Sequence, residues 1–160
     1  RRTKKMSMNF FDSKEHQLIE LKIEKIFFDS IYKKLSAAEQ FYPDFRYWYY
    51  QKVLPDFYSN KRDFIFENRN NNIVGLSLIK YDEKKLCTLK VFEEYQNKGL
   101  GLKLFEKSFE KLDTDKPFLT VSQEKYEEFK KLFNYYKFEL TSVKNGLYRD
   151  NKLEYFFNER

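Results

Sequence analysis

Hydrophobic and polar positions in the middle of the chain alternate first with the period of strands and then with that of a helix. Segments 63–68, 73–81 and 85–92 are short, rich in β-branched and aromatic residues, and separated by Asn-rich or charged turns. This pattern predicts three successive strands. Residues 99–112 carry apolar side chains three and four positions apart, which is typical of an amphipathic helix packed on a sheet.

The C-terminal third repeats both patterns. PFLTVS (117–122) predicts a short buried strand, and EKYEEFKKLFNYY (124–136) predicts a second amphipathic helix. FELTSV (138–143) and LYRDNKLEYFFN (147–158) flank the turn KNG. Two strand-like segments joined by such a turn predict a closing hairpin.

The N-terminal part is less regular. HQLIELKIEKI (16–26) has loosely alternating apolar residues, which fit either a first strand or the start of a helix. Segment 28–41 has helical spacing, and residues 44–54 form a second helical pattern between two prolines.

This element order predicts one α/β (α+β) domain with a mixed central sheet of about seven strands and about four flanking helices. The length of 160 residues suits one core. We expect residues 1–10 to be a flexible basic N-terminus, whose first five residues are candidates for an expression remnant. Residues 11–160 are expected to form the domain.

Charge and composition add little. Arg1, Arg2, Lys4 and Lys5 supply four of the six net positive charges, and elsewhere Lys alternates with Glu and Asp, so a nucleic-acid surface is weakly indicated. The chain has neither a long apolar segment nor a signal-like start. Its single cysteine, Cys87, excludes an internal disulfide. We therefore expect a cytoplasmic protein with no membrane association and no metal site.

Two of the four glycines stand in EEYQNKGLGLKLFE (93–106), between a predicted strand and a predicted helix. The first turn of a helix leaves backbone N–H groups unpaired, so Gly99 and Gly101 indicate a phosphate site. A dinucleotide fingerprint would need glycine at Leu104, and a P-loop would need Lys at Leu102. Another explanation is that the two glycines only allow close packing of helix and strand.

The motif from Gln96 to Gly101, which follows a strand ending at Val91, resembles the acyl-CoA pyrophosphate loop of the GNAT (Gcn5-related) N-acetyltransferases. VFEEY before the loop and KFEL after the second helix also resemble that family's motifs. The resemblance implies a GNAT-like domain that transfers an acetyl group from acetyl-CoA to a primary amine by direct attack on the thioester.

The resemblance also implies site residues. Val91 would offer its backbone amide to the oxyanion. The cofactor-binding set would comprise Leu89, Val91, Gln96, Asn97, Lys98, Gly99, Leu100, Gly101, Leu102 and Tyr126. The acceptor would be a small-molecule or peptide amine, with an aminoacyl-tRNA as a further candidate that the charge supports poorly. Homodimers are common in this fold, so the resemblance leaves a homodimer open, although no residue of the sequence establishes one.

Several positions depart from the family pattern. Phe133 stands where the family usually has a Tyr general acid, and Lys137 replaces a glycine. Tyr126, which shares a helix face with Phe133, is the candidate catalytic hydroxyl, with Tyr135 and Tyr136 as alternatives. Core packing explains all three tyrosines as well.

The usual position of the general base is held by Cys87 and Thr88. We therefore expect Glu67, on a neighbouring strand, to act as the base through a water molecule. An exposed carboxylate that only aids solubility is the simpler explanation for the same residue.

An aromatic block, FYPDFRYWYY, falls on the helical segment that walls the acceptor site in this family. Phe45, Trp48 and Tyr49 either bind the substrate or anchor that helix to the sheet. Two other functions stay open. One is a non-catalytic acyl-CoA-binding regulatory or interaction module; the other is an interaction domain that binds no CoA.

Overall fold

The computed structural model describes residues 10–160, so the expectation of a flexible basic N-terminus falls mostly outside the described part. The chain divides into two compact units, which end and begin between Ala37 and Ala38. No helix within residues 10–160 is long and apolar enough to cross a bilayer.

The first unit contains one long helix, α1 (Phe10–Leu35). Of the two structures that fit segment 16–26, the helix is observed, and the described residues 10–37 contain no strand. Helix-favouring Leu, Glu, Lys and Gln dominate this stretch, and it contains no glycine or proline. Lys25 and Asp29, one turn apart, form an ion pair of 2.9 Å on its surface.

Short helical turns open the second unit: η1 (Ser36–Gln40), α2 (Phe45–Trp48), η2 (Tyr49–Val53) and α3 (Leu54–Tyr58). The helix predicted over 44–54 is therefore observed but continues beyond Pro55. Pro55 directly follows the wide turn of η2, in which Leu54 N donates to Tyr49 O five residues back, and it occupies the first turn of α3. Tyr49 and Val53 are fully buried.

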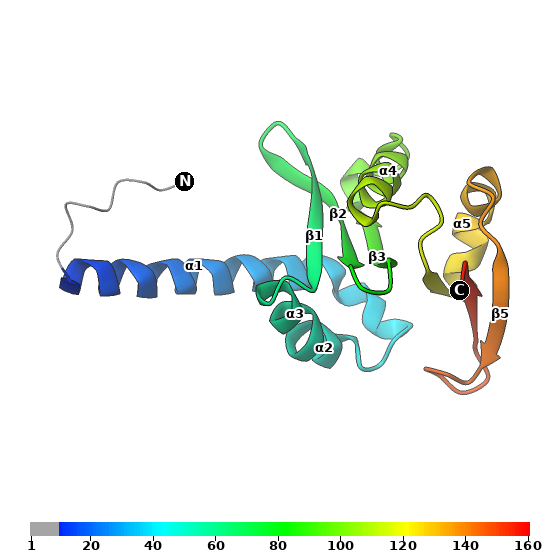
Figure 1. Ribbon diagram of the computed structural model, residues 1–160, viewed down its shortest axis with the longest axis horizontal. Helices are drawn as coiled ribbons and strands as arrows, with labels where there is room; N and C mark the ends of the chain where they lie inside the picture. Colours follow the sequence, from blue (N-terminus) through cyan, green and yellow to red (C-terminus); the bar gives the residue numbers. More distant parts are fainter. Residues whose placement is uncertain (1–9) are drawn as a thin grey trace. The chain divides into compact units, whose positions relative to one another are not determined.

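The first sheet consists of β1 (Arg62–Arg69), β2 (Asn72–Lys80) and β3 (Lys85–Val91), antiparallel and in that order (Figure 1). These are the three strands that the sequence predicts. Leu78 pairs with Thr88, whereas Ile79 pairs with Leu86, so Cys87 is the extra residue of a β-bulge. Such bulges turn a side chain to a new direction and often lie beside functional sites.

The second sheet is antiparallel in the order β4-β6-β5, with β4 (Leu119–Ser122), β5 (Leu140–Asn145) and β6 (Leu153–Phe157). In the described part of the chain, a single parallel bridge between Lys85 and Phe118 joins the two sheets. The predicted central sheet of about seven strands is thus six strands in two sheets, which part after this bridge.

Helix α4 (Leu100–Leu112) packs on the first sheet, and α5 (Gln123–Tyr135) packs on β4 and β6. Their apolar faces meet in one core around Leu104, Phe105 and Phe133. A short turn, η3 (Glu93–Tyr95), connects β3 to α4. The amphipathic patterns therefore predict both helices correctly, because each buries its apolar stripe.

The two faces of the first sheet have different neighbours. Ser77 hydrogen-bonds Ser108 of α4, so its face lies under α4. Phe64 points the other way, toward Tyr49 and Phe57, whose ring centroids lie 6.4 and 5.3 Å from its own. We call these the α4 face and the α2 face.

Candidate functional site

The edge of β3 that faces away from β2 carries unpaired peptide groups near its end. Phe92 N donates to Val74 O at 2.9 Å, so the neighbouring register pair Gly75 and Val91 is not directly hydrogen-bonded. The pair Ser77 and Leu89 lies two positions further along the strands, so it is also not directly hydrogen-bonded. The amides of Leu89 and Val91 therefore point to the edge at which the two sheets part.

A short loop connects this edge to α4. Gln96 donates from Nε2 to Val91 O at 3.0 Å, which fixes the loop to the end of β3. Asn97 and Gly99 both have positive φ, 65° and 76°. Helix α4 begins immediately after Gly99 and has no side-chain cap, so its first-turn amides stay available to an anion.

Internal packing does not account for Gly99 and Gly101. A Cβ built at either position would meet no atom within 4 Å. Gly99 needs its left-handed torsion, whereas Gly101 needs neither that torsion nor space inside the protein. A packing glycine does exist at Gly75, where a Cβ would lie 2.8 Å from Lys90 O. The close-packing explanation for the glycine pair is therefore wrong, and the loop leaves room for a ligand.

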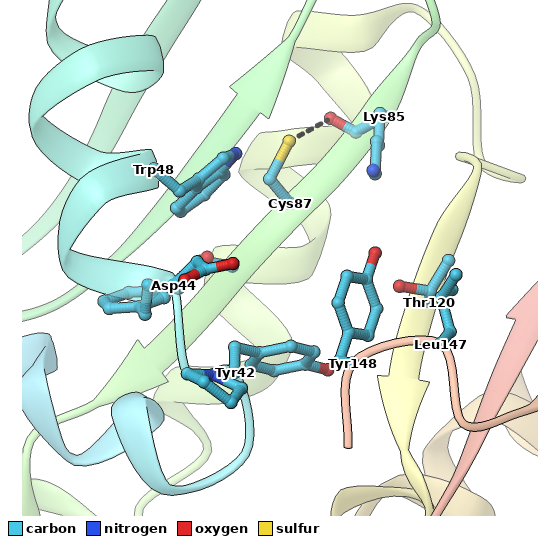
Figure 2. A pocket seen from close by; sticks show the side chains of 11 residues that line it. Tyr42, Asp44, Trp48, Lys85, Cys87, Thr120, Leu147 and Tyr148 are labelled. Carbon is cyan, nitrogen blue, oxygen red and sulfur yellow. Dashed lines mark hydrogen bonds between the residues drawn. The ribbon is translucent and has the colours of Figure 1, made fainter. Parts of the chain in front are cut away.

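A pocket of about 290 Å³ lies where α2, β3, β4 and the β5–β6 turn meet (Figure 2). Thr88 belongs to the α2 face because it is in register with Leu78 and Phe64. The lining residues are mostly aromatic and polar: Tyr42, Pro43, Asp44, Phe45, Trp48, Lys85, Cys87, Thr88, Thr120, Leu147 and Tyr148. The volume fits a small molecule or one end of a larger one.

Arg62 braces one wall of the pocket from behind. Its side chain is 8% exposed, donates to Asp56 at 2.8 Å and contacts Cys87 Sγ at 3.3 Å. Its guanidinium also lies 5.4 Å from the ring centre of Trp48. Hydrogen bonding to Arg62 lowers the pKa of Asp56, and burial raises the pKa of the Cys87 thiol. Cys87 is thus a packed, protonated thiol and a poor nucleophile.

The opposite side of the pocket rests on a buried carboxylate. Tyr42 donates to Glu154 Oε2 at 2.9 Å, and Thr120 also hydrogen-bonds Glu154. Burial raises the pKa of Glu154, and burial together with the carboxylate raises the pKa of Tyr42 and of Tyr148. Both tyrosines are therefore neutral at physiological pH. Figure 2 shows the hydroxyl end of Tyr42 directed toward Thr120 and Tyr148.

Two of the three aromatic residues expected to bind substrate do line this pocket, and the third does not. Phe45 and Trp48 lie on its wall. Tyr49 is fully buried and packs edge-on against Tyr50, with ring centroids 5.0 Å apart. Tyr49 thus anchors the helix, as the alternative explanation has it, whereas Phe45 and Trp48 line the pocket.

The hydroxyl candidates on α5 lie elsewhere. Tyr126 packs on Tyr155 at 4.5 Å between ring centres, on the face of the second sheet opposite to Glu154. Phe133 is 2% exposed within the core. Tyr136 packs against Phe109, and Tyr135 is 72% exposed. None of these side chains lines the pocket.

Glu67 also lies away from the pocket. It is in register with Gly75 and hence with Val91, two strands away, and Lys107 of α4 binds it at 2.7 Å on the α4 face. This hydrogen bond lowers the pKa of the Glu67 carboxyl, which makes it a weaker proton acceptor. Arg69 lies 3.6 Å away as a second cation.

Several residues in or directly behind the pocket escaped sequence reasoning. Tyr42 and Asp44 stand in the aromatic block, so their neighbourhood was visible although their roles were not. Tyr148 and Glu154 belong to the closing hairpin, whose pattern indicates only a turn and a strand. No cluster of three acidic, His or Cys side chains suited to a metal occurs within residues 10–160.

Comparison with known proteins identifies the family. A family profile described as "Acetyltransferase (GNAT) domain" matches residues 19–147. No curated protein matches the chain. Three solved structures share the fold at low sequence identity.

A putative GNAT acetyltransferase from Desulfovibrio desulfuricans superposes with a TM-score of 0.55 at 17% identity, over 62% of this chain and 69% of that one. A GNAT acetyltransferase from Elizabethkingia anophelis, solved with acetyl-CoA bound, gives 0.53 at 16% identity, over 68% and 82%. The ribosomal-protein-S18-alanine N-acetyltransferase from Escherichia coli gives 0.53 at 16%, over 64% and 73%. With its family profile and its fold in agreement, the chain belongs to the GNAT family of acetyltransferases.

Proposed function

We propose that this protein is an acetyl-CoA-dependent N-acetyltransferase that acetylates a primary amine bound in the aromatic pocket. The observation that carries the proposal is the loop before α4, where a left-handed glycine and a second glycine with empty surroundings leave first-turn amides open. The relative from E. anophelis has acetyl-CoA bound, which supports the same donor here.

The residues present fit the donor. The amides from Asn97 to Leu102 would hold its pyrophosphate, with Gln96 keeping the loop in place through Val91 O. The free edge of β3 at Leu89 and Val91 would bind the pantetheine arm as an added strand binds. Because the sheets are joined only near Lys85 and Phe118 among the described residues, the arm would enter where they part.

When bound, acetyl-CoA supplies the activated acetyl group. The protein's part is then to align an amine with it, which alone contributes about 7 to 11 kcal/mol, and to donate the Val91 amide to the acetyl oxygen. Phe133 provides no acid for the leaving thiolate. The loss of a general acid costs about 100- to 10,000-fold in rate, so transfer without one is slower but feasible.

The pocket restricts the acceptor. Its volume of about 290 Å³ and its aromatic wall favour a small amine or the end of a peptide over a folded surface. The E. coli relative is named for an alanine of a ribosomal protein, which makes a peptide N-terminus one sensible probe. A charged tRNA would demand a basic surface and binding that weakens steeply with salt.

Release of the CoA thiol tests the proposal. Purified protein is mixed with acetyl-CoA and, in turn, spermidine, an alanine-initiated peptide, an aminoglycoside and an aminoacyl-tRNA. We expect acceptor-dependent release with at least one of them, and none with Gly101→Glu, which places a carboxylate in the phosphate site. Equal release by the variant would contradict the assignment of the loop.

A non-catalytic acyl-CoA-binding module is the second candidate, and Phe133 at the usual acid position favours it. Both functions require the donor to bind. If acetyl-CoA binds but none of the four acceptors causes release of the CoA thiol, the result would favour the module and contradict the transferase.

A further inference from the structure

One carboxylate of the second sheet is buried directly behind the pocket. Glu154, on the central strand β6, is 4% exposed. Its Oε2 accepts a hydrogen bond from Tyr42 at 2.9 Å, and Thr120 bonds the same carboxylate. Tyr42 and Thr120 both line the pocket, whereas Glu154 does not, so the carboxylate reaches the pocket only through these hydroxyl groups.

The cations around Glu154 are committed to other partners. Arg149 is held by Glu124 through two hydrogen bonds of 2.8 and 3.1 Å. Lys85 lies over the ring of Phe118 at 5.2 Å. Lys144, opposite Glu154 in the register of β5, lies over the ring of Phe156 at 4.7 Å.

No ion pair to Glu154 occurs in residues 10–160. Arg149 and Lys85 favour its charged form from a distance, but burial is the larger effect and raises its pKa. A carboxylate whose pKa is raised in this way is a stronger proton acceptor than an exposed one.

Tyr42 connects this carboxylate to the pocket. Its ring meets that of Tyr148 edge-on at 5.1 Å, and the backbone of Ser122 also bonds its hydroxyl. The phenol donates to Glu154 and its oxygen accepts from the backbone N–H of Ser122, which leaves one lone pair of that oxygen for the pocket. A proton that arrives at this oxygen can therefore be matched by one that leaves toward Glu154.

We propose that Tyr42 and Glu154 act as a proton-accepting pair for the amine bound in the pocket. As the amine nitrogen bonds to the acetyl carbon and the carbon–sulfur bond breaks, the nitrogen loses a proton to Tyr42 Oη. The Tyr42 proton passes to Glu154, and the sulfur leaves as the CoA thiolate. Glu154 then returns its proton to solvent, so protons and charges balance.

In this scheme Tyr42 is the catalytic residue and Glu154 is a positioning residue that acts through it. The inference rests on the proposed N-acetyltransferase function. It replaces Glu67, which lies on the α4 face and is bound by Lys107. A structural role for Glu154, which holds Tyr42 and Thr120 in place, is the competing explanation that the experiment must separate.

The test compares the wild-type protein with Glu154→Gln, Glu154→Asp and Tyr42→Phe, and takes Glu159→Gln as the matched control. Glu159 is an exposed acid that bonds Thr141 and Ser142, away from the pocket. Release of the CoA thiol from acetyl-CoA is measured from pH 6 to 9.5. The acceptor is spermidine, the alanine-initiated peptide or water, depending on which gives the fastest release. Thermal unfolding confirms that each variant is folded.

We expect kcat to fall about 100- to 10,000-fold in Glu154→Gln and Tyr42→Phe, with KM for acetyl-CoA unchanged. A base must be deprotonated, so wild-type kcat rises with pH through the raised pKa of Glu154, and Glu154→Gln loses that rise. Glu154→Asp restores part of the rate and the pH dependence, and Glu159→Gln behaves as wild type.

Rates within about threefold of wild type, with the rise preserved, in Glu154→Gln or in Tyr42→Phe would overturn the pair. Tyr42→Phe removes one oxygen, so it keeps the test decisive if Glu154→Gln does not fold. Failure of the wild-type protein to bind acetyl-CoA, or to release its thiol with any acceptor, would instead overturn the proposed function and the inference with it.

Discussion

The guanidinium of Arg62 contacts the Sγ of Cys87 at 3.3 Å and thereby joins the bulge of β3 to the helical wall of the pocket. The same group binds Asp56 at 2.8 Å and lies under Trp48. One buried cation thus links α2, α3 and β3 behind the pocket, so its removal should lower the stability of the protein.

We expect Arg62→Leu to lower the free energy of unfolding by about 2 to 3 kcal/mol, because it removes charge-assisted hydrogen bonds and leaves Asp56 unpaired. Urea unfolding measures the loss. Lys125→Leu, which breaks the exposed pair with Glu128, is the control and should cost less than about 1 kcal/mol. Similar losses in the two variants would show that Arg62 contributes no more to stability than an exposed ion pair does.

The glycines should respond in opposite ways to alanine. Gly75→Ala brings a Cβ to 2.8 Å from Lys90 O and 3.2 Å from Leu104 Cδ1, so we expect a loss of about 1 to 3 kcal/mol. Gly101→Ala meets nothing and should leave stability unchanged or raise it by up to about 1 kcal/mol. A loss of stability at Gly101 comparable to that at Gly75 would show that Gly101 has a packing role after all.

Glu67 should prove structural. Its pKa is lowered by Lys107, so its contribution to stability is present above the pKa of the unfolded chain and is lost as pH falls through the folded value. Glu67→Gln should cost about 1 to 3 kcal/mol at pH 7 and less in acid, while the pH profile of turnover keeps its shape. Loss of the rise in kcat with increasing pH in this variant would restore Glu67 as the base.

The ion pair between Glu124 and Arg149, next to Tyr148, should also lose its contribution to stability as the pH falls. Arg149 lowers the pKa of Glu124 from 4.5 to about 2. The penalty of Glu124→Gln, measured by urea unfolding, should therefore be full at pH 7 and shrink between pH 4.5 and 2. Because both side chains are partly exposed, solvent screens the pair and the penalty should stay below about 1 kcal/mol. A penalty independent of pH would show that Glu124 acts without its charge.

The sequence predicts local elements better than it predicts how they assemble. The strands ending at Val91 and the helix after Gly99 follow from hydrophobic periodicity, and the glycine spacing correctly points to the family. Segment 16–26 fits two periods at once, and only the structure decides for the helix. In the described part of the chain the two sheets are joined only at the bridge between Lys85 and Phe118, and no local sequence pattern encodes where they part.

The pocket was harder to predict than the loop. The loop is contiguous in sequence, whereas Tyr42 and Glu154 are 112 positions apart and meet only because β6 occupies the centre of its sheet. Glu67 has the right chemistry, but strand alternation places it on the α4 face. Carboxylates can be found in a sequence, but the face on which each lies depends on register.

The central claim is that the loop before α4 binds the pyrophosphate of acetyl-CoA, and a thermal-unfolding titration tests it most directly. Acetyl-CoA at 100 times its dissociation constant should stabilise the wild-type protein by about 2.7 kcal/mol and raise Tm by roughly 5 to 10 °C. Without ligand, Gly101→Glu should have the same Tm as the wild type, since an acidic side chain suits a first helical turn. Acetyl-CoA should not raise the Tm of this variant. An unchanged wild-type Tm at millimolar acetyl-CoA, or an equal shift in the variant, would contradict the account.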